Sequence, residues 1–250
     1  MKKFIKGFVA TLAMGVSSLS NANFLDAQIS KVLMEQAAIS VIMQANYPGD
    51  ETFINHEQDL LELTDGYSVG LMKASTRFAE DYPRYRRAIE ALGHAGSGFI
   101  NHAHLVSDVL IEAIHDSKMS LDSIEPPTAV SSDTHQWRLI QKYVDFSLEY
   151  VFLNSPAIAN PSSEETSQQK AMKVKLLVEE MKDQLVNYQG DKETYIYKKI
   201  SKNSRMLLSV LEKNPYEDIQ MLVYQLSRFL VDDVIAREIS HGSLKVASLD

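Results

Sequence analysis

Cysteine is absent from this 250-residue chain. No disulfide can therefore form, and no lipid can be attached to a cysteine at a leader cleavage site. A compact chain of this size buries roughly 70% of its unfolded surface, which is enough for a core without covalent links. We therefore expect packing to supply the stability of this protein.

Long hydrophobic runs are missing after the N-terminal segment. No later stretch approaches the roughly 18 consecutive apolar residues of a membrane span. Positive charge is also scarce, with 25 Lys and Arg against 33 Asp and Glu and a net charge of −8. General binding to nucleic acid or to anionic lipid is disfavoured, because both need clustered positive charge.

The N-terminal segment has the three parts of a secretory signal peptide. A start that contains three lysines precedes an apolar run from Phe8 to Val16, and small residues follow at Ser20 and Ala22. This order predicts a signal peptide over residues 1–22, cleaved after Ala22. The mature protein would then be periplasmic or secreted.

Apolar residues recur at intervals of three and four along most of the remaining chain, whereas the alternation typical of strands is scarce. The sequence therefore predicts an all-α protein. Short connections favour neighbouring helices that run in opposite directions, so we expect an elongated multi-helix bundle of antiparallel helix hairpins. We divide the mature chain into an N-terminal helical part (23–118), a linker (119–132), a C-terminal helical bundle (133–241) and a tail (242–250).

Cap and turn residues predict where the helices begin and end. Asp26 is expected to cap the first helix, and the turn from Asn46 to Asp50 to end it. A capping box at Asn55 should open the second helix, and Tyr82-Pro83 should end or kink it, because proline disfavours a helical conformation in the preceding residue. Gly93 is expected to be a left-handed helix exit. Further helices are predicted over 99–117, 133–152, 162–188, 191–211 and 214–239.

Histidines are concentrated around a glycine-containing joint. Imidazole groups are common zinc ligands, so His94, His102 and His104 make this region a candidate for a metal or ligand carrier. No HExxH or comparable spacing is present, and the polar row from His104 to His115 extends over about 16 Å, too far for one ion. A solvated polar face is the simpler interpretation, and we predict no metal ligand and no cofactor.

The segment from Tyr67 to Lys73, which contains Gly-Leu-Met-Lys, resembles the GLMQ signature of lytic transglycosylases, helical enzymes that cut peptidoglycan. In that family a catalytic glutamate followed by serine precedes the motif. This chain has no such Glu-Ser pair and has lysine where the family has glutamine. The resemblance implies a cell-wall-acting enzyme as an alternative function, with Glu57 or Glu62 as the candidate acid.

Two segments combine aromatic with basic side chains, a combination that binds anionic groups and stacks on planar ones. In an acidic, exported protein they are candidate contact sites for an acidic partner. The candidate partner-binding residues are Tyr82, Arg84, Tyr85, Arg86 and Arg87 in the first segment and Tyr195, Tyr197, Lys198 and Lys199 in the second.

The segment from Phe78 to Tyr85 also resembles a Phe-x-x-x-Tyr-Pro-x-Tyr segment of exported helical proteins of conjugative type IV secretion systems. Those proteins are minor-pilus or mating-pair-formation components. The broader likeness is architectural: a signal peptide, no cysteine, and helices around a flexible middle. The resemblance implies a role in interaction and carries over no functional residue.

The polar residues are distributed over the outer faces of amphipathic helices and do not form the convergent set that an active site requires. We therefore predict no catalytic residue and a non-enzymatic, exported helical protein. Its partners would be envelope or secretion-apparatus proteins and not nucleic acid. A cell-wall enzyme and a periplasmic metal or ligand carrier are the alternatives, and the oligomeric state stays open.

Overall fold

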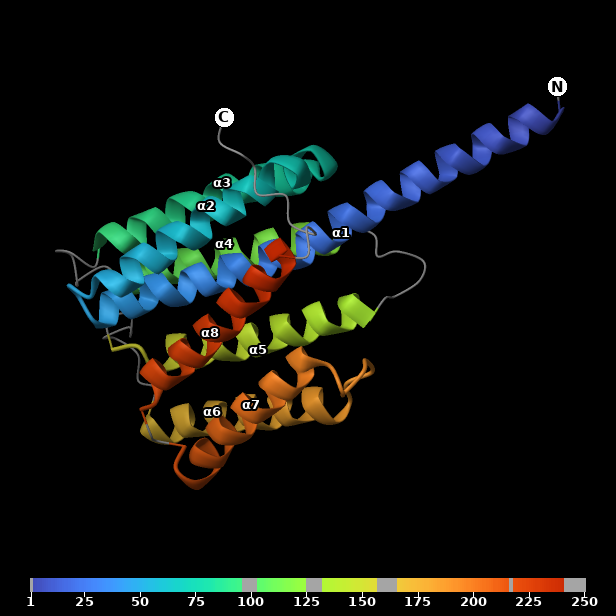
Figure 1. The fold of residues 1–250 in the computed structure, drawn as a ribbon. Helices are drawn as coiled ribbons and strands as arrows, with labels where there is room; N and C mark the ends of the chain where they lie inside the picture. Colours follow the sequence, from blue (N-terminus) through green and yellow to red (C-terminus); the bar gives the residue numbers. More distant parts are fainter. Residues whose placement is uncertain (1, 96–102, 125–131, 157–165, 216–217, 241–250) are drawn as a thin grey trace.

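A computed structural model describes residues 2–95, 103–124, 132–156, 166–215 and 218–240. These residues form eight α-helices and no strand, which confirms the predicted all-α fold (Figure 1). The helices are α1 (Lys2–Asn46), α2 (Glu51–Ala74), α3 (Thr76–Ala95), α4 (Ala103–Asp122), α5 (Ser132–Asn154), α6 (Ser167–Val186), α7 (Tyr195–Lys213) and α8 (Gln220–Ser240).

The C-terminal half of α1 is the central helix of the bundle. Every residue from Ala27 to Met43 is buried, and α1 packs against α2, α3, α4, α5 and α8. A helix buried on all sides is normally apolar all round, yet this one carries Lys31, Glu35 and Gln36 in its buried stretch. These polar groups need partners on the surrounding helices, because unpaired buried polar groups are strongly unfavourable.

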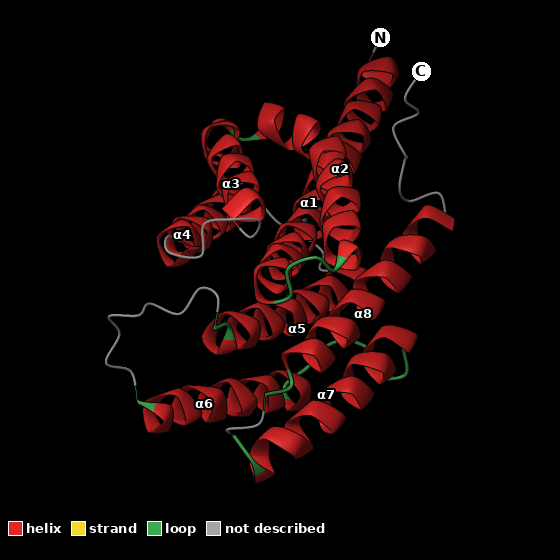
Figure 2. Ribbon diagram, turned by 90° about the vertical axis from the view of Figure 1, so that its left-hand side faces the viewer, coloured by secondary structure: helices red, strands yellow, loops and turns green. Residues whose placement is uncertain are grey.

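The other helices cover α1 in two groups. α2 follows α1 through a tight turn and lies along it, and α3 pairs with α4 on the same side. α5 and α8 cover the opposite side. The α6–α7 pair is outermost and packs on α5 (Figure 2). One continuous hydrophobic core includes residues from α1 and from each of the seven helices that follow it.

The turn between α1 and α2 lies where the sequence predicts it. Gly49 has a φ of 92°, a left-handed conformation that glycine adopts without a Cβ clash. Asp50 then caps α2, because its Oδ1 accepts a hydrogen bond from the backbone N–H of Thr52 at 3.0 Å. The second helix therefore begins at Glu51, and the start predicted at Asn55 is wrong.

The break between α2 and α3 lies at Ser75 and not at Tyr82-Pro83. The backbone N–H of Ser75 donates to the carbonyl oxygen of Leu71 at 2.8 Å and ends α2. Its Oγ accepts a hydrogen bond from the N–H of Phe78 at 3.2 Å and opens α3. The proline is accommodated inside α3, because burial of the tyrosines on both sides of it outweighs the local preference of the sequence.

Gly93 is not the left-handed exit that we predicted. α3 continues to Ala95, and among the described residues Gly49 alone has a positive φ. Gly93 instead lies where α3 packs on α1 and α2, and there is room for a Cβ at this position. A Cβ at this position would lie 3.5 Å from Cγ2 of Val41 on α1 and 3.7 Å from Oε2 of Glu57 on α2.

The other helices occur where predicted, with shifted ends. α1 runs without a break from Lys2, so Asp26 does not cap it, and cleavage of the leader stays a prediction. α4 extends to Asp122, into the stretch predicted as a linker. Helices α6 and α7 begin later than expected because Thr166 and Thr194 supply their N-caps, and α8 begins at Gln220 rather than at 214.

Candidate functional site

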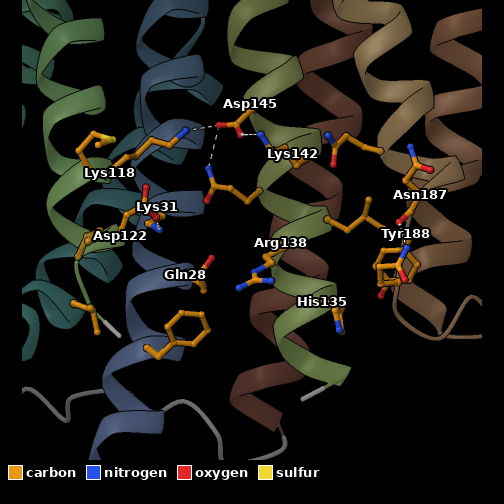
Figure 3. Close-up of a pocket in the computed structure, with 18 of the residues that line it drawn as sticks. Gln28, Lys31, Lys118, Asp122, His135, Arg138, Lys142, Asp145, Asn187 and Tyr188 are labelled. Atoms are coloured by element: carbon orange, nitrogen blue, oxygen red, sulfur yellow. Dashed lines mark hydrogen bonds and ion pairs between the residues drawn. The ribbon is translucent and has the colours of Figure 1, made fainter. Parts of the chain in front are cut away.

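An open cleft of about 690 Å³ lies between α1, α4 and α5, and the end of α6 forms part of its wall (Figure 3). This volume is within the range of ~300–1,000 Å³ that small-molecule sites occupy. Apolar side chains line part of it, namely Phe24, Met119, Leu121, Ile124 and Leu139. The contribution of α6 and the residues after it is polar: Gln184, Asn187, Tyr188 and Gln189.

A buried ionic network lies beside the cleft and links three helices. The ammonium group of Lys118 donates hydrogen bonds to Glu35 and to Asp145, and the side-chain amide of Gln141 donates to Glu35. Burial raises the pKa of Glu35 well above its usual range. Burial alone would also raise the pKa of Asp145, but the hydrogen bond with Glu35 and the charge of Lys118 outweigh it and lower that pKa. Burial therefore disfavours the charged form of Glu35, whereas the hydrogen bonds and the cation favour the charged form of Asp145.

Two cationic side chains of α5 line the cleft. Arg138 and Lys142 are four residues apart, so they lie on one face of the helix. The Lys142 ammonium is 3.8 Å from Oδ2 of Asp145, whereas within the described part of the chain Arg138 makes no ion pair. On the opposite wall, the buried Lys31 pairs with the exposed carboxylate of Asp122.

Two polar atoms of the cleft residues are buried without a hydrogen-bond partner among the described residues. They are the side-chain carbonyl oxygen of Gln141 and the hydroxyl of Tyr188. The ring of Tyr188 is held by stacking on Tyr197, with 5.0 Å between the centroids, and by an edge contact with His135. Unsatisfied buried polar groups of this kind are uncommon in folded proteins.

A second surface feature lies on the outermost helix pair. In α6 the buried stripe consists of Ala171, Val174, Val178 and Met181. At ~100° per residue, Met172 and Leu176 lie on the opposite side of the helix. Their side chains are 65% and 62% exposed. We call Met172 and Leu176, with the exposed Lys173 and Lys175 beside them, the α6 ridge.

In the first predicted contact segment, both tyrosines are buried. The hydroxyl of Tyr82 donates to Oδ1 of Asp65 at 2.5 Å, and the hydroxyl of Tyr85 donates to the carbonyl oxygen of Met34 at 3.1 Å. These two residues therefore join α3 to α2 and α1. While α3 stays packed, they cannot reach a partner.

Of the arginines in this segment, Arg84 and Arg87 are exposed and Arg86 is half-buried. Arg84 is 3.2 Å from Oδ2 of Asp116, and Arg86 is 3.3 Å from Oδ1 of Asp65. Arg87 is exposed, with no ion pair among the described residues. A contact role for these three arginines stays a prediction.

The second predicted contact segment also makes internal contacts. The ring of Tyr195 is exposed and packs against the guanidinium group of Arg237, 3.7 Å from the ring centroid. Lys199 pairs with Asp233 at 3.1 Å. These contacts join α7 to α8, so they have a structural role whether or not a partner also binds there.

The remaining members of that segment differ in exposure. Tyr197 is half-buried, and its ring stacks on Tyr188. Lys198 is exposed and pairs with Glu193 at 2.7 Å. The structure brings Tyr195, Lys198 and Lys199 to the surface at one end of α7, far along the chain from the arginines of α3.

Ser40, His56 and Asp232 form a row that resembles a hydrolytic triad in its order of contacts. Ser40 Oγ is 3.0 Å from Nδ1 of His56, and Nε2 of His56 is 3.2 Å from Oδ1 of Asp232. The hydroxyl of Tyr224 also contacts Nδ1 at 3.1 Å. Ser40 is fully buried, so a substrate carbonyl cannot reach its hydroxyl in this arrangement. The row joins α1, α2 and α8.

The acid candidates from the sequence differ in environment. Glu57 is 8% exposed, and burial raises its pKa to about 7, while the nearby Arg86 partly offsets that effect. Glu62 is exposed on the same helix. Neither residue lines the cleft described above.

The candidate histidine site cannot be placed. The side chains of His94 and His104, and the whole of His102, lie outside the described residues. Within the described residues, no group of three or more histidines and acidic residues is arranged to hold a metal ion.

The charged residues inside the first helix were missed as functional candidates. Lys31 and Glu35 interrupt an otherwise apolar stretch, and a charge in such a stretch usually signals a buried partner. The pair Arg138 and Lys142 was also missed, although its four-residue spacing is visible in the sequence. The residues that pair with Lys31 and Glu35 lie on other helices. Most of the residues that form the cleft beside Arg138 and Lys142 lie outside α5.

The chain is an all-α bundle whose described surface includes a polar cleft and the exposed apolar α6 ridge. Comparisons of the chain with known protein families, with curated proteins and with solved structures found no match. None of the helices, over the residues that the structure describes, combines the length and the apolar character of a membrane span.

Proposed function

We propose that this chain is an exported, non-enzymatic helical protein that binds macromolecular partners of the cell envelope. The observation that supports this function is the α6 ridge. Two large apolar side chains, Met172 and Leu176, are exposed on the side of α6 opposite its buried stripe. α6 belongs to the outermost helix pair (Figure 2). Exposed apolar groups that adjoin one another are typical of protein contact sites.

The charged residues beside the α6 ridge indicate what kind of partner surface would complement it. Lys173 and Lys175 are exposed beside the apolar pair, in a chain whose overall charge is −8. Glu179 and Glu180 are also exposed, one turn further along the same side of α6, so a complementary partner surface would have an apolar centre bordered by charges of both signs. The resemblance around Phe78 adds the expectation that the partner belongs to a secretion or conjugation apparatus.

In vivo photo-crosslinking tests this function. A photoreactive amino acid at Leu176 should give a discrete envelope-protein adduct, and a second substitution, Met172→Glu, should remove that adduct. Val69 is the matched control, because it is 53% exposed but lies on α2, away from the ridge. Equal crosslinking from positions 69 and 176, or an adduct that persists with Met172→Glu, would rule the ridge out as the contact site.

A second candidate is a cell-wall-acting enzyme, which only the raised pKa of Glu57 favours, because this carboxyl group is buried and lines none of the described pockets. A carboxyl group with a pKa near 7 is suited to donate a proton at neutral pH. Purified protein would then digest peptidoglycan, and Glu57→Gln would abolish the digestion whereas Glu62→Gln would not. Absence of digestion by the wild-type protein would remove this candidate.

A further inference from the structure

We propose that the cleft between α1, α4 and α5 binds a small hydroxylated organic anion, and that Arg138 holds its acidic group. This site is separate from the α6 ridge, so the proposal does not depend on partner binding. Its support comes from the charge, the unpaired polar atoms and the shape of the cleft.

The cleft is locally cationic in an acidic protein. Lys31, Lys118, Arg138 and Lys142 line it, against the carboxylates of Asp122 and Asp145. Both lysines on the α1–α4 side are already paired with carboxylates. The positive charge that remains for a ligand is therefore on α5.

Arg138 and Lys142 together form the acid-binding end. Like charges four residues apart on a helix repel one another, and an anion between them removes that repulsion. The guanidinium group of Arg138 has no ion pair with the described residues and presents a planar set of donors that fits a carboxylate or a phosphate. Lys142 keeps only a long 3.8 Å contact with Asp145.

Two polar atoms that are unpaired within the described residues belong to the cleft walls, and a ligand hydroxyl reaches them when these side chains turn toward the cleft, because both atoms are enclosed by protein in this structure. The side-chain carbonyl oxygen of Gln141, a residue 8% exposed, has no donor within the described residues, and a ligand hydroxyl would supply one. The hydroxyl of Tyr188 likewise has no partner in that part of the chain. The two atoms belong to different walls of the cleft, α5 and the segment after α6.

Apolar side chains in the cleft indicate that the part of the ligand beyond its acidic group contains carbon. Phe24 and Leu139 line the cleft together with polar amides, so the body of the ligand contacts both carbon and polar surface. An organic acid or a phosphate ester with a short hydroxylated backbone matches these walls better than an inorganic ion does. The acidic group can be a carboxylate or a phosphate, and the choice is left to experiment.

Isothermal titration calorimetry with the full mature chain tests the proposal. Citrate and glycerol 3-phosphate are the two hydroxylated anions, tricarballylate is citrate without its hydroxyl, and glycerol is the neutral control. We expect one of the two hydroxylated anions to bind, glycerol not to bind, and Arg138→Gln to weaken binding at least about tenfold, as expected for the loss of a charge-assisted hydrogen bond. Arg205→Gln is the matched control, because Arg205 is exposed on α7 outside the cleft.

Each outcome decides the proposal. Preference for citrate or for glycerol 3-phosphate assigns the acidic group, and tighter binding of citrate than of tricarballylate assigns the hydroxyl contact. Equal weakening by Arg138→Gln and Arg205→Gln would mean general attraction to positive charge and would overturn the site. No binding of either anion at millimolar concentration would also overturn it. Both substitutions are at exposed positions, and unchanged thermal unfolding would show that both variants are folded.

Discussion

Lys118 on α4 donates a hydrogen bond to Glu35, a carboxyl group that is almost fully buried on the central helix α1. The same ammonium group also donates to Asp145 on α5, so one cation joins three helices. Burial raises the pKa of Glu35, whereas the charge of Lys118 and the hydrogen bonds to Asp145 lower the pKa of that residue. Lys118 and Glu35 should therefore contribute unequally to the free energy of unfolding.

Lys118→Met should destabilise the protein far more than Glu35→Gln. Among the described residues, removing the lysine leaves the half-buried carboxylate of Asp145 with only the longer 3.8 Å ion pair to Lys142, which costs about 2–3 kcal/mol. Replacing Glu35 with glutamine keeps a hydrogen-bonding side chain where burial disfavours a charge, and we expect a loss of about 1 kcal/mol or less. Urea unfolding at pH 7 measures both values. Equal losses would show that Glu35 is ionised in the folded protein.

Glu57 should make stability depend on pH in the neutral range. Its pKa is about 7 in the folded protein against an ordinary value of 4.5, so the folded form binds the proton more tightly than the unfolded form does. Stability is therefore highest at acidic pH and falls as the pH rises from about 4.5 to about 7. Glu57→Gln cannot ionise, and at pH 8 it should be more stable than the wild type by about 3 kcal/mol.

The matched control for this prediction is Glu62→Gln, because Glu62 is exposed on the same helix. Urea midpoints between pH 5 and pH 8 should be similar for this variant and the wild type. If the Glu57→Gln curve instead ran parallel to that of the wild type, Glu57 would be ionised at neutral pH in the folded protein.

Gly93→Ala should stabilise the protein, whereas Gly49→Ala should destabilise it. Gly93 lies within α3, and a new Cβ would make ordinary contacts of 3.5 Å or more. Alanine there should add about 0.5–1 kcal/mol by restricting the unfolded chain. Gly49 has a φ of 92°, where alanine costs about 1–2 kcal/mol. A loss of stability in Gly93→Ala, measured by thermal unfolding, would instead support the left-handed exit expected from the sequence.

Pro83→Ala should also raise stability. Pro83 lies inside α3 and removes the helical hydrogen bond to the carbonyl oxygen of Ala79. Alanine restores the N–H donor, and we expect a gain of about 1–3 kcal/mol. Pro48→Ala is the control, since Pro48 lies in the turn before α2. No gain at position 83 would indicate that the helix is interrupted there.

The positions of the helices could be predicted from the sequence, and their ends only in part. The turn at Asn46 to Asp50 was predictable because a glycine and a capping aspartate are local signals. The continuation of α3 through Pro83 was not predictable, because the buried tyrosines around this proline pack against residues that are distant in the chain. Local preference predicts an interruption there, and tertiary burial removes it.

The candidate site was less predictable than the fold. The predicted tyrosines Tyr82 and Tyr85 are buried, whereas Met172 and Leu176 belong to a helix whose other apolar residues are buried in the ordinary way. A sequence shows that a helix has apolar residues on two faces, but not which face a neighbour covers. Arg138 became a candidate only when α1 and α4 were placed beside it.

By itself the sequence determined that the chain is helical, acidic and free of disulfides, because helical periodicity, charge and cysteine content are properties of short segments or of composition. The tertiary structure alone decided which charged groups meet. Glu35 and Lys118 are 83 residues apart, and their contact exists because α1 is enclosed by helices from both halves of the chain. The burial that raises the pKa of Glu35 and the cleft beside it both result from that enclosure.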